Sequence, residues 1–428
     1  MMELKSFNLS LFVQYDYFCP MEFYTHCLKN GMRIIHKQVP NVVAHAGIMI
    51  DVGSRDESDA EEGLSHFIEH CLFKGTKNRK AFHVLSRLED VGGELNAYTT
   101  KEDTYIYASF IKDYYERSIE LFFDILFCST YPEKELLKEK DVIVDEINSY
   151  KDSPSEQIFD DFEGLIFNGD ALGRNVLGTE ESLEGLTREN MQSFVDRYFQ
   201  PENMVFSSVG DMEPAKLFKL VEKYFEHIPS KGKENKRSKV NLYTPQHKIE
   251  ALSQFQTHCM IGNRAYGAKD EKRKTLVLLN NLLGGPGLSS RLNMGIREKY
   301  GFAYSVESNY HYYSDTGLFS IYFGTDEKYL DRVGKLVEKE LFKLMDKPLG
   351  IRQLDKAKRQ IIGQIAIAQE NHAQLMTTMA KSYHTYGKVD SLEAVYDKIW
   401  QISSAEIQNV ANEIFCPDDL STLIFKKR

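Results

Sequence analysis

Residues 63–73 read Gly63-Leu64-Ser65-His66-Phe67-Ile68-Glu69-His70-Cys71-Leu72-Phe73. Their apolar residues recur at helical spacing, which predicts a largely buried amphipathic helix. His66 and His70 are four residues apart, so both side chains point to the same side of that helix. Two neutral imidazoles on one side supply half of a tetrahedral zinc site. Glu69 lies beside them and can hold a water bound to that metal.

The histidine pair also has a second interpretation. A histidine on an apolar helix face is usually a hydrogen-bonded core residue, and a five-residue pattern also arises by chance. The metal interpretation needs a third ligand on a neighbouring element, because catalytic zinc takes three protein ligands and keeps one position open. Glu146 is the candidate, in an expected helix at residues 133–150 in which we expect Val142, Ile143 and Ile147 to form one buried stripe. Glu139 lies two turns before Glu146 and shares its face. Without the histidine motif, both glutamates would be interpreted as solvent-exposed.

Length and charge narrow the class of protein. A chain of 428 residues exceeds the usual size of a single core, so two domains are expected. The formal net charge of −10 argues against a nucleic-acid binder and is compatible with a basic partner or substrate. No apolar run approaches the length that spans a membrane.

Six scattered cysteines, without a Cys-x-x-Cys pair, fit reduced thiols in a cytoplasm. Residues 1–20 do not form a convincing signal peptide, because polar residues interrupt their apolar ones. We therefore interpret them as an N-terminal extension and expect a location in bacterial cytoplasm. Translation from Met1 and translation from Met21 both remain open.

The rest of the sequence predicts strands mixed with helices. In the first half, the expected strands are 32–39, 42–52, 94–100, 104–111 and 204–209. The other expected helices there are 80–91, 114–128, 133–150, 156–167 and 214–227. In the second half, we expect strands at 258–261, 302–312, 317–323 and 421–425, a helix at 272–283 and long helices up to residue 383.

The second half repeats the order of the first, which predicts an α+β fold of two homologous domains, each a mainly antiparallel sheet packed with helices. We expect a zinc-binding domain at 21–229, a polar and basic linker at 230–243 and a degenerate copy at 244–428. An overlay of Gly285 on Gly75 aligns Leu276, Leu279 and Asn280 with His66, Glu69 and His70, so the copy keeps the packing but not the ligands.

The segment His66-Phe67-Ile68-Glu69-His70, with Glu146 at this distance, resembles the inverted zinc motif of the pitrilysin/insulinase metallopeptidases, which are inverzincins. The two-domain length resembles the mitochondrial processing peptidase β branch and its bacterial relatives. The resemblance implies that His66, His70 and Glu146 bind one Zn²⁺ per chain. It also implies that Glu69 is the general base and that Glu139 holds the ring of a ligand histidine.

The resemblance also implies substrate contacts in both halves. Asn96 and Ala97 lie in a stretch similar to the family's strand beside the metal, which pairs with an extended peptide. Arg297 and Tyr304 look like the family's Arg/Tyr element, which stabilises the substrate carbonyl. Read alone, these four residues are an ordinary strand end, a helix-end arginine and a strand tyrosine.

An acidic pair four residues apart, Glu156 and Asp160, resembles the processing-peptidase segment that receives an arginine of the substrate. Both carboxylates can face one guanidinium. Acidic residues early in a helix also stabilise its dipole, which is the alternative explanation of this pair.

The function implied by the resemblance is a zinc endopeptidase that cleaves unfolded peptides or processing segments. In the family two halves close around a chamber, and this chain would supply one half of that clamshell. A homodimer follows, in which one subunit's Arg297 and Tyr304 face the other's zinc site; a heterodimer with a related subunit is an alternative. A non-catalytic binding or scaffold subunit is a further alternative, although all three ligands and the base are present. The physiological peptide, the cleavage specificity and the choice between processing and degradation stay open.

Overall fold

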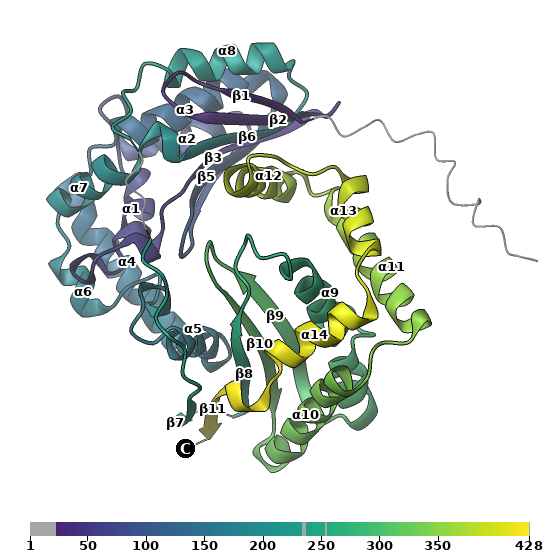
Figure 1. Cartoon of the computed structure of the whole chain (residues 1–428). Helices are drawn as coiled ribbons and strands as arrows, with labels where there is room; N and C mark the ends of the chain where they lie inside the picture. Colours follow the sequence, from purple (N-terminus) through teal and green to yellow (C-terminus); the bar gives the residue numbers. More distant parts are fainter. Residues whose placement is uncertain (1–22, 233–236, 253–254, 428) are drawn as a thin grey trace, which may run out of the picture.

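The computed structural model describes residues 23–232, 237–252 and 255–427. The expected N-terminal extension at 1–20 and residues 233–236 of the expected linker lie outside the described residues. Two β-sheets, each covered by helices, divide the described chain into two halves (Figure 1). The α+β fold expected from the sequence is confirmed.

The first sheet has six strands in the order β1-β2-β6-β3-β5-β4. They are β1 (Tyr24–Cys27), β2 (Arg33–Gln38), β3 (Val43–Ile50), β4 (Glu94–Thr99), β5 (Thr104–Ile111) and β6 (Met204–Gly210). Only β2 and β6 run parallel. All seven residues of β6 are buried, because the strand lies inside the sheet with both faces covered. β4 forms one edge of the sheet and pairs with β5 alone among the described strands.

Seven helices of the first half are α1 (Leu64–Leu72), α2 (Ala81–Glu89), α3 (Tyr115–Cys128), α4 (Glu133–Lys151), α6 (Glu180–Gly185), α7 (Arg188–Tyr198) and α8 (Pro214–Phe225). Their apolar faces form one core with the sheet, in which Phe67, Phe122 and Phe206 are fully buried. Burial of such side chains is the main favourable term for this half.

The second sheet has five strands in the order β7-β11-β8-β10-β9. They are β7 (His247–Leu252), β8 (Thr257–Ala265), β9 (Ala303–Tyr312), β10 (Gly317–Thr325) and β11 (Ser421–Lys427). The helices around it are α9 (Arg273–Gly284), α10 (Leu330–Asp346), α11 (Ile351–Ala368), α13 (Leu392–Trp400) and α14 (Ser404–Ile414). Within the described residues, no helix combines the length and apolar character needed to cross a membrane.

The two sheets share one topology. Strands β2, β3, β4, β5 and β6 correspond in chain order to β7, β8, β9, β10 and β11, and the corresponding strands have the same neighbours. Each set contains one parallel pair, β2 with β6 and β7 with β11, and is otherwise antiparallel. The internal repeat inferred from the sequence is therefore present in the backbone.

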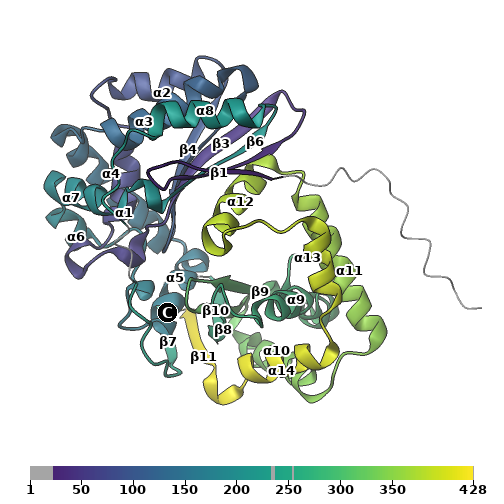
Figure 2. The same cartoon turned by 45° about the horizontal axis from the view of Figure 1, so that its top comes forward.

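Each half lends one helix to the sheet of the other half (Figures 1 and 2). Helix α5 (Pro154–Ile166) packs on the second sheet, where Ile158 and Phe162 contact a buried cluster that includes Met260 and Phe425. Helix α12 (His372–Tyr386) packs on the first sheet, with Met379 in a cluster of buried residues from β2, β3 and β6. Since α5 and α12 occupy equivalent places in the repeat, the exchange is reciprocal and holds the halves together.

Buried ion pairs also cross between the halves. The guanidinium of Arg55 lies 2.6 Å from Glu102 and 2.7 Å from Asp315, and the Arg55 side chain is only 4 % exposed. Arg237, from the expected linker, lies 2.9 Å from Asp56 and 3.1 Å from Asp51. Arg237 thus anchors the described part of the expected linker to acidic residues of the first half.

The exchanged helix yields a stability prediction. We expect Met379→Ala to lower the free energy of unfolding by about 2–5 kcal/mol, because it leaves a cavity between α12 and the first sheet. Amide hydrogen exchange in β3 and β6 should accelerate, although residue 379 lies in the other half of the sequence. Gln374→Ala, at an exposed position of the same helix, is the control. Unchanged exchange in β3 and β6 would contradict the assigned packing.

Candidate metal centre

Two contacts fix the start of helix α1. Gly63 precedes the helix with φ +86°, and a Cβ there would lie 2.8 Å from the carbonyl oxygen of Leu177, so only glycine fits. The buried carboxylate of Glu57 accepts hydrogen bonds from the backbone N–H of Gly63 (2.9 Å) and of Ser65 (2.7 Å). Burial raises the pKa of Glu57 to about 8. Sequence inspection missed Glu57, since only its place before the helix hints at a capping role.

The side chains of His66, His70 and Glu146 converge where α1 packs on α4. Their possible ligand atoms all lie within 4.8 Å of one another. His66 Nε2 lies 3.3 Å and His70 Nε2 lies 3.6 Å from the same oxygen, Glu146 Oε2. The packing of two helices therefore assembles three residues that are spread over 81 positions of the sequence.

The donor set fits zinc. Zinc takes imidazole nitrogens and carboxylate oxygens at about 2.0–2.2 Å, which places neighbouring ligands of a tetrahedron about 3.4 Å apart. The two nitrogen–oxygen separations, 3.3 and 3.6 Å, match that edge length. Three protein ligands also leave a fourth position for water or substrate, as in catalytic zinc sites.

Local electrostatics favour a cation at this place. Burial lowers the pKa of His66, whereas the nearby carboxylates of Glu146 and Glu69 raise it, with a net value of about 9. The hydrogen bond with His66 lowers the pKa of Glu146, which keeps that carboxylate ionised. Because a metal binds only the neutral imidazole, protons compete with it for His66 below about pH 9, and the metal affinity increases with pH.

A chain of contacts orients His70. Its Nδ1 lies 3.2 Å from Glu139 Oε2, and the other oxygen of Glu139 lies 2.7 Å from Lys74 Nζ. The Glu139 side chain is 8 % exposed, so it bridges the two groups away from solvent. The expected position of Glu139 beside a ligand histidine is thus where the structure places it. Lys74, two residues beyond the end of α1, was not singled out from the sequence.

Glu69 lies on the site side of α1. Its Oε2 is 3.7 Å from His66 Nδ1, beyond hydrogen-bond distance, and is a buried oxygen without a hydrogen-bond partner. Burial and then the negative charge of Glu69 raise the pKa of Tyr107 on β5. An unpaired buried carboxylate oxygen is costly in a core and useful to a proton acceptor.

The expected substrate strand lies next to the metal centre. Asn96 and Ala97 belong to edge strand β4, which contacts α1, and Asn96 pairs in register with Tyr107 of β5. The Asn96 side chain is exposed, whereas Ala97 packs against the core of the first half. Tyr107 is a third residue that sequence inspection missed, although the two expected antiparallel strands place it opposite Asn96.

Glu156 and Asp160 lie on α5, near the metal ligands. Helix α5 contacts α4, and burial and then the charges of Glu146, Asp160 and Glu156 raise the pKa of Tyr150 on α4. Glu156 is exposed. Asp160 is half-buried and accepts a hydrogen bond of 3.2 Å from the side chain of Asn175, and burial raises its pKa. The two members of the expected acidic pair therefore differ in access to solvent.

The expected Arg/Tyr element, Arg297 and Tyr304, lies in the second half of the described chain and does not contact the metal cluster. Arg297 lies on a π-helix, η7 (Asn293–Glu298), and Tyr304 lies on edge strand β9. Both are exposed, and the Tyr304 hydroxyl donates a hydrogen bond of 3.2 Å to Asp326. No contact between described residues connects either side chain with the metal cluster.

The bridge through Glu139 yields a prediction for metal affinity. Lys74→Met removes the positive charge that holds the Glu139 carboxylate in place. We expect zinc affinity to fall about 10–100-fold, which is typical when a residue that orients a metal ligand is mutated. Lys74→Arg should restore most of it. Competition with a chromogenic chelator measures the affinity, and Lys77→Met, at an exposed position, is the matched control. A lower melting temperature with unchanged affinity would show a purely structural role.

Comparison with known proteins identifies the family. Residues 33–180 match the family described as insulinase (peptidase family M16), and residues 185–361 match its companion described as the peptidase M16 inactive domain. The chain is 31 % identical over 397 residues to the uncharacterized zinc protease YmxG of Bacillus subtilis, covering 92 % of this chain and 96 % of that protein. It is also 31 % identical over 415 residues to an uncharacterized zinc protease of Rickettsia felis, covering 93 % and 96 %.

Solved structures share the fold. A protease from Helicobacter pylori matches with a TM-score of 0.87 at 23 % identity, over 95 % of this chain and 100 % of that one. A peptidase M16 inactive domain from Pseudomonas fluorescens also gives 0.87, at 17 % identity, over 95 % and 98 %. Family matches in both halves and relatives of the same length lead to one conclusion: this chain belongs to the M16, pitrilysin-like, zinc protease family.

Proposed function

We propose that this chain is a zinc-dependent endopeptidase that cleaves unfolded peptides or processing segments. The observation that carries the proposal is the cluster of His66, His70 and Glu146 with the unpaired Glu69 oxygen beside it. One Zn²⁺ per chain, held by these three side chains, would supply Lewis-acid chemistry that polarises a peptide carbonyl and acidifies water.

Glu69 would move the proton. Its buried Oε2 accepts no hydrogen bond from the described residues, so it would be available to accept a proton from the attacking water. The same oxygen would later return the proton to the leaving amine. Glu139 and Lys74 would keep the His70 ring fixed meanwhile, so that the geometry needs no reorganisation during the reaction.

The substrate would lie along β4. A strand that ends a sheet exposes unpaired backbone groups, to which an extended peptide can add as a further strand. Asn96 and Ala97 would pair with the peptide beside the metal. Glu156 and Asp160 would attract a basic side chain, with exposed Glu156 as the more accessible acceptor because Asp160 is bound to Asn175.

We further propose that the working enzyme is a homodimer. Arg297 and Tyr304 are exposed and lack contacts with this chain's own metal cluster, so a second subunit is needed to bring them to a zinc site. A heterodimer with a related chain would meet the same need. A cytoplasmic location in bacteria fits the free thiols of all five cysteines in the described residues.

The base assignment gives the direct test of the function. Glu69→Gln keeps the shape but removes the proton acceptor, so we expect one zinc per chain and hydrolysis reduced by about 10²–10⁴-fold. Zinc is measured by atomic emission, and cleavage of an unstructured peptide pool by mass spectrometry. Glu89→Gln, exposed at the end of α2, is the control. Full activity of Glu69→Gln would disprove the assignment, and zinc without cleavage in the unaltered chain would favour the non-catalytic alternative.

The shared site gives a complementation test. Glu69→Gln and Arg297→Ala should each be nearly inactive alone. After subunit exchange, half of the dimers are mixed and carry one intact site of two, so about a quarter of the original activity should return. Fluorescence transfer between labelled subunits verifies the exchange. Verified exchange without recovered activity, or full activity in a stable monomer, would contradict a site completed by the partner.

A further inference from the structure

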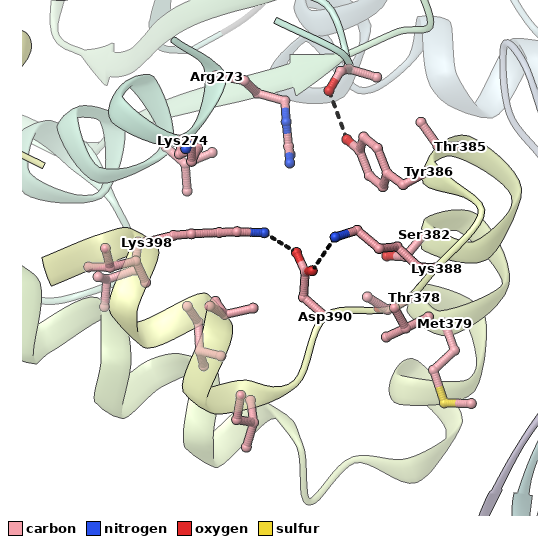
Figure 3. A pocket seen from close by; sticks show the side chains of 18 of the residues that line it. Arg273, Lys274, Thr378, Met379, Ser382, Thr385, Tyr386, Lys388, Asp390 and Lys398 are labelled. Carbon is pink, nitrogen blue, oxygen red and sulfur yellow. Dashed lines mark hydrogen bonds and ion pairs between the residues drawn. The ribbon is translucent and has the colours of Figure 1, made fainter. Parts of the chain in front are cut away.

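A pocket of about 780 Å³ lies between α9, α11, α12 and α13 (Figure 3). Helix α12 packs on the first sheet and also lines this pocket, and its Leu375 and Met379 belong both to the packed cluster and to the pocket wall. The residues of the metal centre do not contribute to its walls. The pocket therefore belongs to a part of the molecule that the proposed peptidase activity does not use.

The inner wall of the pocket is aliphatic. It includes Leu278 of α9, Ile361 and Ile365 of α11, Met379 of α12, and Ile399 of α13. Volumes of about 300–1,000 Å³ with mainly apolar walls are typical of sites for small organic ligands. A wall in which aliphatic side chains predominate favours a hydrocarbon chain over a sugar or a nucleotide.

The mouth of the pocket is cationic. Five cationic and three anionic side chains line the pocket, although the whole chain carries a net charge of −10. Lys388 and Lys398 both pair with the single carboxylate of Asp390, at 3.2 Å from Lys388. Figure 3 shows the two lysines reaching Asp390 from opposite sides. One carboxylate balances only one of them, so positive charge remains.

Arg273 adds a cation without an acid. No carboxylate of the described residues forms an ion pair with it, and its guanidinium instead lies 4.6 Å from the ring centre of Tyr312 and 5.7 Å from that of Tyr386. The Tyr386 hydroxyl is fixed by a hydrogen bond of 2.8 Å to the carbonyl of Ala268. Figure 3 shows Arg273 directed into the space in front of Asp390. The aromatic rings thus hold a planar donor ready for an anion.

We propose that this pocket binds a single-chain anionic amphiphile of the fatty-acid class, with the carboxylate at Arg273 and the acyl chain along the wall formed by α9, α11 and α13. Guanidinium and carboxylate match in geometry and can form two parallel hydrogen bonds. The acyl chain gains by leaving water for an aliphatic wall. Such a ligand touches helices of the second half and α12, so it would also stabilise the docking of α12.

Two matched detergents test the head group. Titration calorimetry compares dodecanoate with dodecyltrimethylammonium, both below micelle-forming concentrations. The two detergents have the same twelve-carbon length but head groups of opposite charge. A protein of net charge −10 attracts the cationic detergent non-specifically. We expect saturable one-to-one binding of dodecanoate and at least about tenfold weaker binding of the cation, because it lacks the charge-assisted hydrogen bonds. Equal affinity for both would overturn the proposal.

Three variants locate the ligand. Arg273→Gln should weaken dodecanoate binding at least about tenfold, the usual effect of losing a hydrogen bond to a charged group. Thr378→Trp, from an exposed position on the pocket wall, should abolish binding by filling the space without burdening the core. Lys335→Gln removes a charge at an exposed position outside the pocket and should leave binding unchanged.

Three results would contradict the proposal. They are an equal loss in Lys335→Gln, unaltered binding in Thr378→Trp, and displacement of dodecanoate by a peptide with the sequence of residues 1–20, which would make the chain's own N-terminal segment the occupant.

Discussion

The metal centre depends on the packing of α1 against α4. The nine residues of α1 carry two imidazoles and one carboxylate on one side, and α4 presents Glu139 and Glu146 two turns apart toward them. Each carboxylate meets a histidine, at 3.2 and 3.3 Å. Since two carboxylates in a partly buried place need a compensating charge, the centre is arranged for a cation. Lys74 neutralises Glu139, which leaves Glu146 free to serve as the ligand.

The duplicated fold explains why one half carries the chemistry and the other does not. Both halves place a helix after the second strand of the repeat, and the overlay of Gly285 on Gly75 aligns Leu276, Leu279 and Asn280 of α9 with the metal residues of α1. The copy keeps the sheet, the exchanged helix and an edge strand, and these suffice for packing. Because α5 and α12 are exchanged, the hydrophobic core of each half includes a helix from the other half. The two repeats therefore form one folded unit, in which β4 and β9 are edge strands.

Local patterns predicted much of this structure. Alternating and helical periodicities predicted most of the described strands and helices, although α6, α7, α13 and α14 were missed, and β5 and the start of α4 agree with the expected residues. The spacing of His66 and His70, one helical turn, predicted that these two side chains lie together, and the resemblance to the pitrilysin/insulinase family added Glu146 as their partner. The strands that were missed, β1 and β7, lie at sheet edges and are largely exposed, so they lack the burial pattern on which recognition depends.

Contacts between residues far apart in the chain could not be predicted from the sequence. An amphipathic pattern shows that α12 buries one face, but not that this face covers the sheet of the other half. The partner of Lys74, the burial of Arg237 among acids, and the Asn175 bond that occupies Asp160 all depend on residues brought together only by the fold.

X-ray absorption at the zinc edge, on protein loaded with one equivalent of zinc, tests the central claim most directly. The account predicts two imidazole nitrogens and one carboxylate oxygen from the chain, with one further light atom, and a changed spectrum in Glu146→Ala. Sulfur ligands, a fully hydrated ion, or a spectrum that Glu146→Ala leaves unaltered would contradict it.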